Sequence, residues 1–110
     1  MFTKIVNREI PADIIYEDDE IIAFKDINPQ APVHFLVVPK KEISTLNDIQ
    51  EADALLVGKM FCVVKKIAKD LDIDKSGYRT VFNCNDDAGQ TVLHIHLHVL
   101  AGRVMVWPPG

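Results

Sequence analysis

The stretch "TVLHIHLHVLAG", residues 91–102, places three of the four histidines of the chain within five positions. Histidine alternates there with apolar residues, which is typical of a β-strand whose two faces differ. In a strand over residues 93–101 the imidazoles would stand on one face, each roughly 6.6 Å from the next. These histidines are His94, His96 and His98, while Leu93, Ile95, Leu97 and Val99 would form the opposite face beneath a helix.

Shorter elements are predicted on the N-terminal side of this stretch. A short helix over residues 3–10 would end at Pro11, because proline cannot continue a helix. Runs of β-branched and aromatic residues, bounded by turn residues, predict further strands. These strands are expected at residues 13–18, 21–28, 33–39 and 78–84, with loops or turns at residues 18–20, 28–32 and 85–90.

One long helix is predicted from about residue 51 to residue 70. Its apolar residues recur at steps of three and four, which produces a single stripe for packing on a sheet. The stripe consists of Leu56, Met60, Val63, Val64, Ile67 and Leu71. The fold class is therefore α+β: one domain over residues 1–110, with an antiparallel sheet of about five strands, this helix and the short N-terminal helix.

Apolar residues of the same helix also lie off the stripe. They are Leu55, Val57, Phe61 and Cys62. A chain of 110 residues has only one sheet face to cover them, so the surplus predicts a homodimer whose helices and edge strands meet across a two-fold axis.

Composition narrows the classes of partner. The chain has 12 Lys and Arg against 16 Asp and Glu, which gives a net charge of −4. No basic patch suits a nucleic acid polymer or an anionic membrane, although one pocket can be locally positive. No apolar run approaches the ~20 residues of a membrane span. Cys62 and Cys84 sit among apolar neighbours and are predicted to be buried thiols, so a soluble cytoplasmic protein, also compatible with the nucleus, is expected.

The row of histidines has three interpretations. It could be a surface face without function, although such faces normally carry Thr, Lys, Glu or Ser. It could be a zinc site, made from a His-x-His pair with His34, although the outer imidazoles stand too far apart to share one ion. It could also be an anion site, in which the central imidazole attacks phosphorus. The preceding turn favours the anion site, because Gly89 lets the backbone approach an anion and Thr91 adds a hydroxyl.

At this point the sequence resembles a known family. "HIHLHVL" is similar to the His-φ-His-φ-His-φ-φ signature of the histidine triad (HIT) superfamily, where φ is an apolar residue. The segments "FKDINPQAPVHFLVVPKKEIS", "GYRTVFNCNDDAGQTVLHIHLHVLAGR" and "WPPG" resemble its histidine triad nucleotide-binding (Hint) branch over nearly the whole chain. The resemblance implies a homodimeric purine nucleoside phosphoramidase. Such an enzyme cleaves the P–N bond between a nucleoside 5′-monophosphate and an amine without a metal or cofactor.

The resemblance also implies a role for each matching residue. His96 would be the nucleophile, and His94 and His34 would complete the imidazole network that orients it. The phosphate would contact His98, Asn83, Gly89, Thr91 and Val92, and Asp26 would accept hydrogen bonds from the ribose hydroxyls. Without the resemblance, Asp26 reads equally well as a turn residue. The base pocket would be formed by Phe2, Phe24 and Ile27, and Trp107 would reach the active site of the partner subunit.

Four positions depart from the pattern of the Hint branch. Thr91 stands where many members carry Ser, and the dinucleoside polyphosphate hydrolases of the superfamily carry Thr there. Lys25, Glu42 and Val106 each replace a histidine that is common in the branch. Two alternatives to the phosphoramidase therefore stay open, a dinucleoside polyphosphate hydrolase and a non-catalytic purine-nucleotide-binding or adaptor module.

Overall fold

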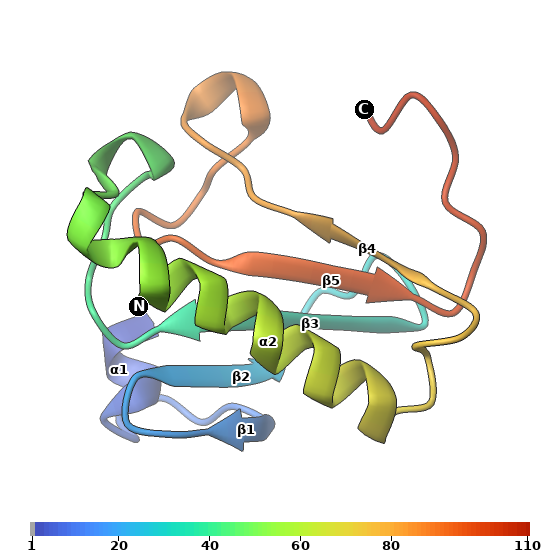
Figure 1. Ribbon diagram of the computed structural model, residues 1–110, viewed down its shortest axis with the longest axis horizontal. Helices are drawn as coiled ribbons and strands as arrows, with labels where there is room; N and C mark the ends of the chain where they lie inside the picture. The colour runs from blue at the N-terminus through green and yellow to red at the C-terminus, as the bar shows by residue number, and fades with distance from the viewer. Residues whose placement is uncertain (1) are drawn as a thin grey trace.

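The computed structural model describes residues 2–110 and contains one five-stranded sheet, one long helix and several short helical turns (Figure 1). Its helices are α1 (Phe2–Val6) and α2 (Ala54–Asp70), with 3-10 turns η1 (Leu46–Asp48), η2 (Glu51–Asp53) and η3 (Asp86–Ala88). Its strands are β1 (Ile14–Glu17), β2 (Ile21–Lys25), β3 (Val33–Pro39), β4 (Tyr78–Val81) and β5 (Leu97–Ala101). The predicted α+β class is confirmed.

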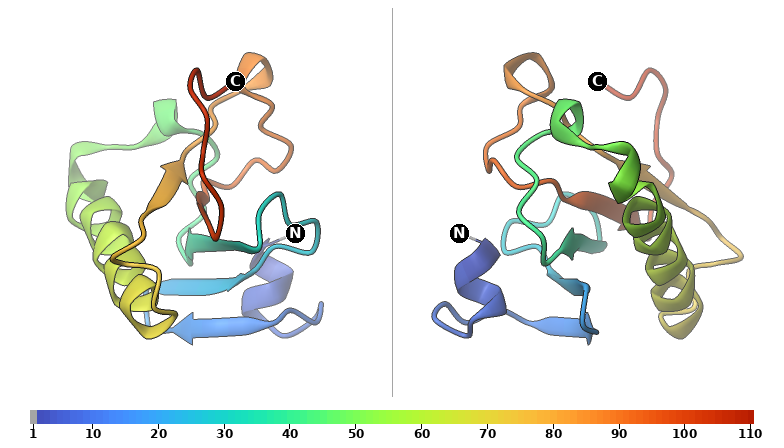
Figure 2. Two further views of the ribbon diagram at one scale, coloured as in Figure 1. Left: turned by 90° about the vertical axis from the view of Figure 1, so that its right-hand side faces the viewer. Right: turned by 60° about the vertical axis from the view of Figure 1, so that its left-hand side comes forward.

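The strands pair in the order β1-β2-β3-β5-β4, and each neighbouring pair is antiparallel. Helix α2 lies across one face of the sheet, and α1 lies on the opposite side (Figure 2). The sheet is therefore the middle layer, and its two faces have different neighbours.

Each face has its own apolar cluster. The larger cluster joins the sheet to α2 and includes the stripe residues Met60, Val63, Val64 and Ile67. Ile95, Leu97 and Val99 pack into the same cluster, as the alternation predicted. The smaller cluster covers the other face and consists of Phe2, Ile5, Ile22, Phe24, Leu36 and Val38. The histidines belong to the side of this smaller cluster, away from α2.

The last strand begins later than predicted. It starts at Leu97 rather than at residue 93, so His94 and His96 precede the regular ladder. Leu97 pairs with Val37, and continuing that register would place Pro39 opposite Ile95. Proline has no N–H to donate, so the ladder stops and the Ile95 amide donates to the carbonyl of Ile43 instead (2.8 Å).

Three single-residue predictions were wrong. Leu93 was expected in the apolar layer, but it is 68% exposed because it precedes the strand. Leu71 was expected on the helix stripe, but it follows the last residue of α2 and is exposed. The two cysteines were expected to be buried, but Cys62 is exposed and Cys84 is only partly buried. Cys62 lies off the apolar stripe, on the part of α2 that faces away from the sheet.

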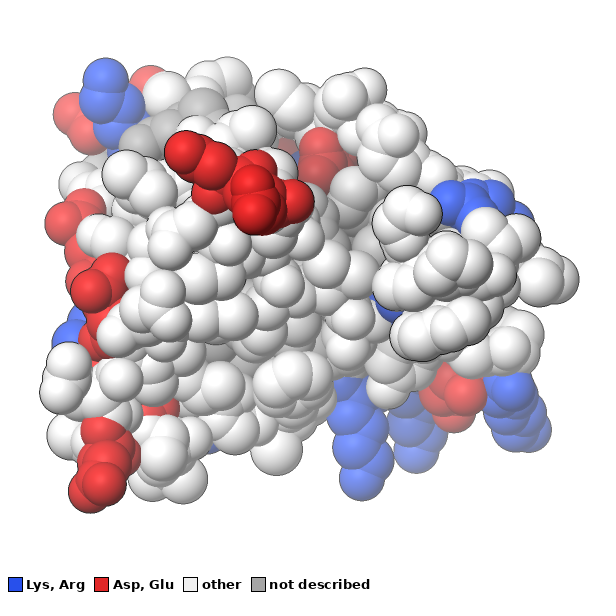
Figure 3. Space-filling view, turned by 90° about the horizontal axis from the view of Figure 1, so that it is seen from above, with Lys and Arg blue, Asp and Glu red and all other residues white. Residues whose placement is uncertain are grey.

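The surface has no extended basic area on the side that carries the η3 turn and the C-terminal segment. Figure 3 shows that this face is largely uncharged, with basic side chains gathered along one border. None of the described helices is both long enough and apolar enough to cross a membrane.

Candidate nucleotide site built around His96

A cavity of about 300 Å³ opens on the face of the sheet opposite α2. Most of the predicted site residues line it: Phe2, Phe24, Asp26, Ile27, Asn83, Gly89, Thr91, Val92, His96 and His98. Its other lining residues are Ile5, Ile10, Pro11, Ala12, Lys25 and Leu36. Sequence reasoning missed most of these, because only the tertiary fold brings the segment after α1 beside the ends of β2 and β3.

His96 presents one free ring nitrogen to this cavity. Its Nδ1 lies 2.7 Å from the backbone oxygen of His94. A carbonyl oxygen can only accept, so in the neutral ring Nδ1 carries the proton and Nε2 carries the lone pair. Within residues 2–110 Nε2 has no protein partner, and no side-chain nitrogen there is both unpartnered and sealed from solvent. The lone pair of Nε2 is therefore open to a ligand in the cavity.

His34 and His98 form a second, directional pair. The Gln30 amide donates to Nδ1 of His34 (3.0 Å), so the His34 proton lies on Nε2. That Nε2 lies 2.9 Å from Nδ1 of His98, which accepts the proton. The neutral His98 ring then carries its own proton on Nε2 and can donate it to an anion. The sheet register explains the pair, because His34 lies opposite Leu100 and is thus a diagonal neighbour of His98.

His94 supports the site without lining the cavity. Its Nε2 donates to the carbonyl of Pro39 (2.6 Å), and its own carbonyl holds Nδ1 of His96. Both rings pack edge-on against Phe2, with centroid distances of 5.6 Å for His94 and 5.0 Å for His96. The structure therefore places His94 as a support for His96 on the same side of the sheet.

Asp26 makes two different contacts at the end of β2. Its Oδ1 accepts the amide of Asn28 (2.8 Å), so the turn-residue interpretation is correct for this oxygen. Its Oδ2 lies 3.4 Å from Nε2 of His34 and reaches the cavity. Residue 26 thus fixes the start of the loop and also offers a carboxylate oxygen to the cavity.

Burial keeps the imidazoles neutral. Desolvation lowers the pKa of His34, and the negative charge of Asp26 opposes this only in part. Desolvation likewise lowers the pKa of His96, whose bond to the His94 carbonyl acts in the opposite direction. Desolvation, with repulsion from His96 and His34, lowers the pKa of His98 to about 4. Near neutral pH, all three rings are therefore uncharged in the empty site.

The turn before the histidines supplies backbone donors. Gly89 follows η3 in the left-handed conformation (φ 78°), which glycine adopts without steric cost. Within residues 2–110 the amides of Thr91 and Val92 donate to no protein acceptor. Asn83, two residues beyond β4, brings a side-chain amide to the same part of the cavity. This end of the cavity can bind an anion with neutral donors.

The opposite end of the cavity is apolar. Phe2 and Phe24 pack edge-to-face there with their centroids 5.7 Å apart, and α1 holds Phe2 in place. Ile27 lines the rim and is 93% exposed, so a ligand would cover it. The side chain of Thr3 in α1 hydrogen-bonds Glu42 in the segment after β3, which ties α1 to the sheet. A flat aromatic group would fit between these apolar side chains.

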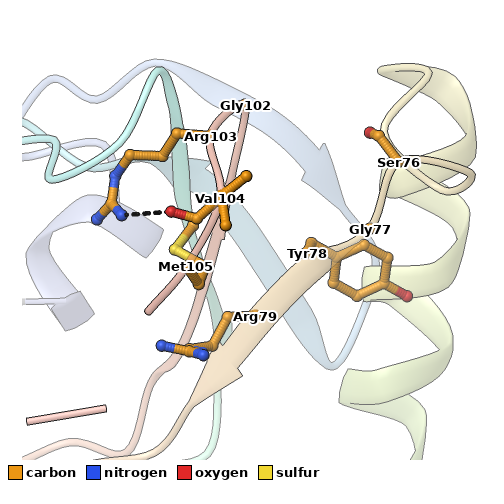
Figure 4. A pocket seen from close by; sticks show the side chains of 8 residues that line it. All are labelled: Ser76, Gly77, Tyr78, Arg79, Gly102, Arg103, Val104 and Met105. Carbon is orange, nitrogen blue, oxygen red and sulfur yellow. Dashed lines mark hydrogen bonds between the residues drawn. The ribbon is translucent and has the colours of Figure 1, made fainter. Parts of the chain in front are cut away.

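Trp107 does not reach the cavity of its own chain. It is 80% exposed, and its ring lies 5.8 Å from the guanidinium carbon of Arg79. A second hollow of about 730 Å³ lies between β4 and the residues that follow β5 (Figure 4). Arg79 and Arg103 line it, but both guanidinium groups donate to backbone carbonyls, and no histidine is present. This hollow therefore lacks the groups needed for catalysis.

A possible metal-binding group differs from the one predicted. Ligand atoms of Asp26, His34 and His98 lie within 4.8 Å of one another. The predicted zinc site would instead have used a His-x-His pair with His34. In the structure His34 and His98 already share one proton in a direct hydrogen bond, and a metal would have to displace it.

Comparison with known proteins agrees with this geometry. Residues 7–105 match the HIT domain family. An uncharacterized HIT-like protein of Synechocystis sp. is 50% identical over 110 residues, which cover 100% of this chain and 96% of that protein. The chain belongs to the HIT family.

Solved structures extend the comparison. A HIT family hydrolase from Legionella pneumophila has a TM-score of 0.98 and 50% identity, with 100% of this chain and 98% of that chain covered. A histidine triad nucleotide-binding protein from Candida albicans has a TM-score of 0.81 and 33% identity, with 89% of this chain and 71% of that chain covered. The architecture and the order of its elements are thus those of HIT proteins.

The lowered imidazole pKa values predict that stability depends on pH. Between the folded pKa values and about 6.5, the unfolded chain binds more protons than the folded chain. This contribution is fully present above pH 6.5 and is lost as the pH falls towards about 4, the value for His98. Thermal melts at pH 7.5, 6.5, 5.5 and 4.5 measure it. His98→Gln should show a shallower decline than the wild type, and an equal decline would contradict the assignment.

Proposed function

We propose that the protein is a purine nucleoside phosphoramidase, which hydrolyses the P–N bond of nucleoside 5′-phosphoramidates through a nucleotidyl group on His96. The observation that carries this proposal is the unpartnered Nε2 of His96, which opens into a cavity with an anion-binding end and an apolar end. The bond from Nδ1 to the His94 carbonyl supports the assignment, because it fixes the tautomer in which Nε2 is the nucleophile.

Nucleophilic catalysis suits this substrate class. Nε2 of His96 would attack phosphorus, form an N–P bond and release the amine as the original P–N bond breaks. Water would then attack the phosphoimidazole and release the nucleoside monophosphate, and His96 would return to its neutral form. His98 and Asn83 would hold the phosphoryl oxygens with Gly89, Thr91 and Val92.

The leaving amine must gain a proton, and the structure changes the expected source of that proton. A histidine with an ordinary pKa near 6.5 was expected to act as the acid. In the empty cavity the pKa values of His34, His96 and His98 are all lowered, so no imidazolium is waiting. A bound phosphoryl anion stabilises a positive imidazole and raises its pKa. The acid would therefore form only in the complex with substrate.

The other residues fit a nucleotide in a single orientation. Asp26 would accept hydrogen bonds from the ribose hydroxyls through Oδ2, since Oδ1 is already used in the turn. Phe2, Phe24 and Ile27 would enclose the base. His34 would orient His98, to which it is directly hydrogen-bonded. The names of two similar proteins, a HIT family hydrolase and a histidine triad nucleotide-binding protein, support both parts of the proposal.

A paired assay tests the proposed reaction. Adenosine 5′-phosphoramidate and diadenosine polyphosphate are offered separately, with and without EDTA. Preferential, EDTA-insensitive turnover of the phosphoramidate is expected. Preference for the dinucleotide would favour a dinucleoside polyphosphate hydrolase, to which Thr91 already points. Turnover of neither would leave a nucleotide-binding or adaptor module, and activity lost to EDTA and restored by zinc would indicate a metal enzyme.

Replacement of the nucleophile should separate catalysis from binding. His96→Ala is expected to lower kcat by roughly 10³-fold or more, because the covalent step is removed. AMP should still bind, since the ribose, base and turn contacts remain. Steady-state kinetics and calorimetric titration with AMP measure the two effects. Near-normal kcat in a folded variant would rule out covalent catalysis at His96.

Replacement of the carboxylate should affect ribose recognition. Asp26→Asn keeps an oxygen that can accept the Asn28 amide, so the turn should persist. A hydrogen bond to a charged acceptor contributes about 1.5–3 kcal/mol, so the preference for AMP over 2′-deoxy-AMP should fall by roughly tenfold or more. Competitive inhibition constants for the two ligands measure this preference. An unchanged ratio would confine Asp26 to its role in the turn.

The proposed active form is a cytoplasmic or nuclear homodimer. β4 is an edge strand, so its outer side can continue the sheet into a second subunit. The off-stripe residues Leu55 and Phe61 are exposed, as expected for a surface that a second α2 would cover. Val104, Val106 and Trp107 are also exposed. In the dimer, Trp107 would lie beside the substrate of the partner subunit.

Deletion of residues 104–110 tests the role of the tail. Sedimentation should show a dimer before and after the deletion, because the contacts of α2 and β4 remain. AMP should still bind, and kcat/KM should fall most for substrates with bulky or aromatic leaving amines. A wild-type monomer at micromolar concentration would contradict the dimer. An equal loss for every amine would contradict a role of the tail in specificity.

A further inference from the structure

The side chain of Gln90 connects three backbone segments around the cavity, although Gln90 itself is not among the lining residues. Its Oε1 accepts the amide of Asn85 (2.8 Å). Its Nε2 donates to the carbonyl of Ser44 (2.8 Å) and to that of Val92 (3.1 Å). Both amide hydrogens and one oxygen lone pair are therefore used, and none of these bonds serves a helix or a strand.

The turn that Gln90 holds has an unusual backbone. Asn85 has φ 63° and ψ −168°, a region that residues with a side chain rarely occupy. The backbone amide of Gln90 donates to the carbonyl of Asn85 (3.1 Å), and the side chain bonds the amide of that same residue. Gln90 thus closes the turn on both sides of the peptide unit that is hardest to hold. Asn83 precedes this turn, and Gly89 lies at its end.

The bond to Ser44 ties the turn to the histidine stretch. Ile43, the neighbour of Ser44, accepts the amide of Ile95 (2.8 Å), and Ile95 lies between His94 and His96. One short segment, residues 43–44, is therefore bonded both to the turn and to the chain that carries the nucleophile. Through Gln90, the position of the turn is fixed relative to His96.

We propose that Gln90 is a positioning residue that holds the anion-binding turn in register with His96, and so determines affinity for the phosphate rather than for the nucleoside. This inference rests on the proposed function, because the phosphate is assigned to the turn there. The amide of Gln90 itself is used within the turn, so its effect passes through Asn83 and the amides of Thr91 and Val92. Loss of its side-chain bonds should loosen these donors while leaving the apolar end of the cavity unchanged.

The experiment compares two ligands that differ only in the phosphate. Gln90→Met keeps the length of the side chain but removes all three hydrogen bonds. Calorimetric affinity for AMP should fall roughly tenfold, as expected when several bonds of ordinary strength no longer preorganise the turn, while affinity for adenosine stays within about twofold. With the phosphoramidate substrate, kcat should fall more than KM rises. Gln50→Met is the matched control, because the side chain of Gln50 makes one bond of 3.4 Å to the carbonyl of Asp48, outside the cavity.

A second variant covers failure of the first to fold. Gln90→Glu retains the acceptor for Asn85 and loses both donors, and it should give the same selective loss for AMP. Unchanged AMP affinity, or an equal fall for AMP and adenosine, would overturn the proposal.

The two proposals fail in different ways. If the wild type binds AMP but cleaves neither phosphoramidate nor diadenosine polyphosphate, the proposed reaction is wrong, and the AMP-to-adenosine ratio still decides the role of Gln90. A wild type that binds AMP no better than adenosine would overturn both proposals.

Discussion

The pairing of β3 with β5 is the constraint on which the site depends. Its register sets Leu36 opposite His98 and His34 opposite Leu100, so two imidazoles from distant segments become diagonal neighbours. The same register brings Pro39 to the point where β5 would need a donor, and there the ladder ends. A slip of one residue would turn every side chain of β5 to the other face and remove the site.

The end of the ladder gives the histidines different environments. His98 stays in the strand and pairs with His34. His96 lies just before the strand and bonds the carbonyl of His94, which leaves Nε2 free. His94 is anchored to Pro39. A uniform strand would have given three equivalent imidazoles, whereas the interrupted strand provides an orienting residue, a candidate nucleophile and an anion donor.

The electrostatics of the cavity follow from where these rings lie. They are packed on the sheet face opposite α2, against Phe2 and the smaller apolar cluster. Burial there lowers their pKa values, so an anion would meet neutral hydrogen-bond donors and a neutral nucleophile. The acidic net charge of −4 is thus compatible with an anion site, because the site relies on local donors rather than on overall charge.

Sequence alone determined the elements and most of the candidate residues. Periodicity located α2 and β3 closely, because local alternation and three- to four-residue steps are properties of consecutive residues. The motif around the histidines indicated the family and, with it, a residue set most of which lines one cavity. Only the tertiary structure decided the tautomer of His96, the lowered pKa values, the exposure of Leu93 and the bonds of Gln90. These depend on which carbonyl, proline or ring a distant segment brings into contact, and no local pattern in a single sequence contains that information.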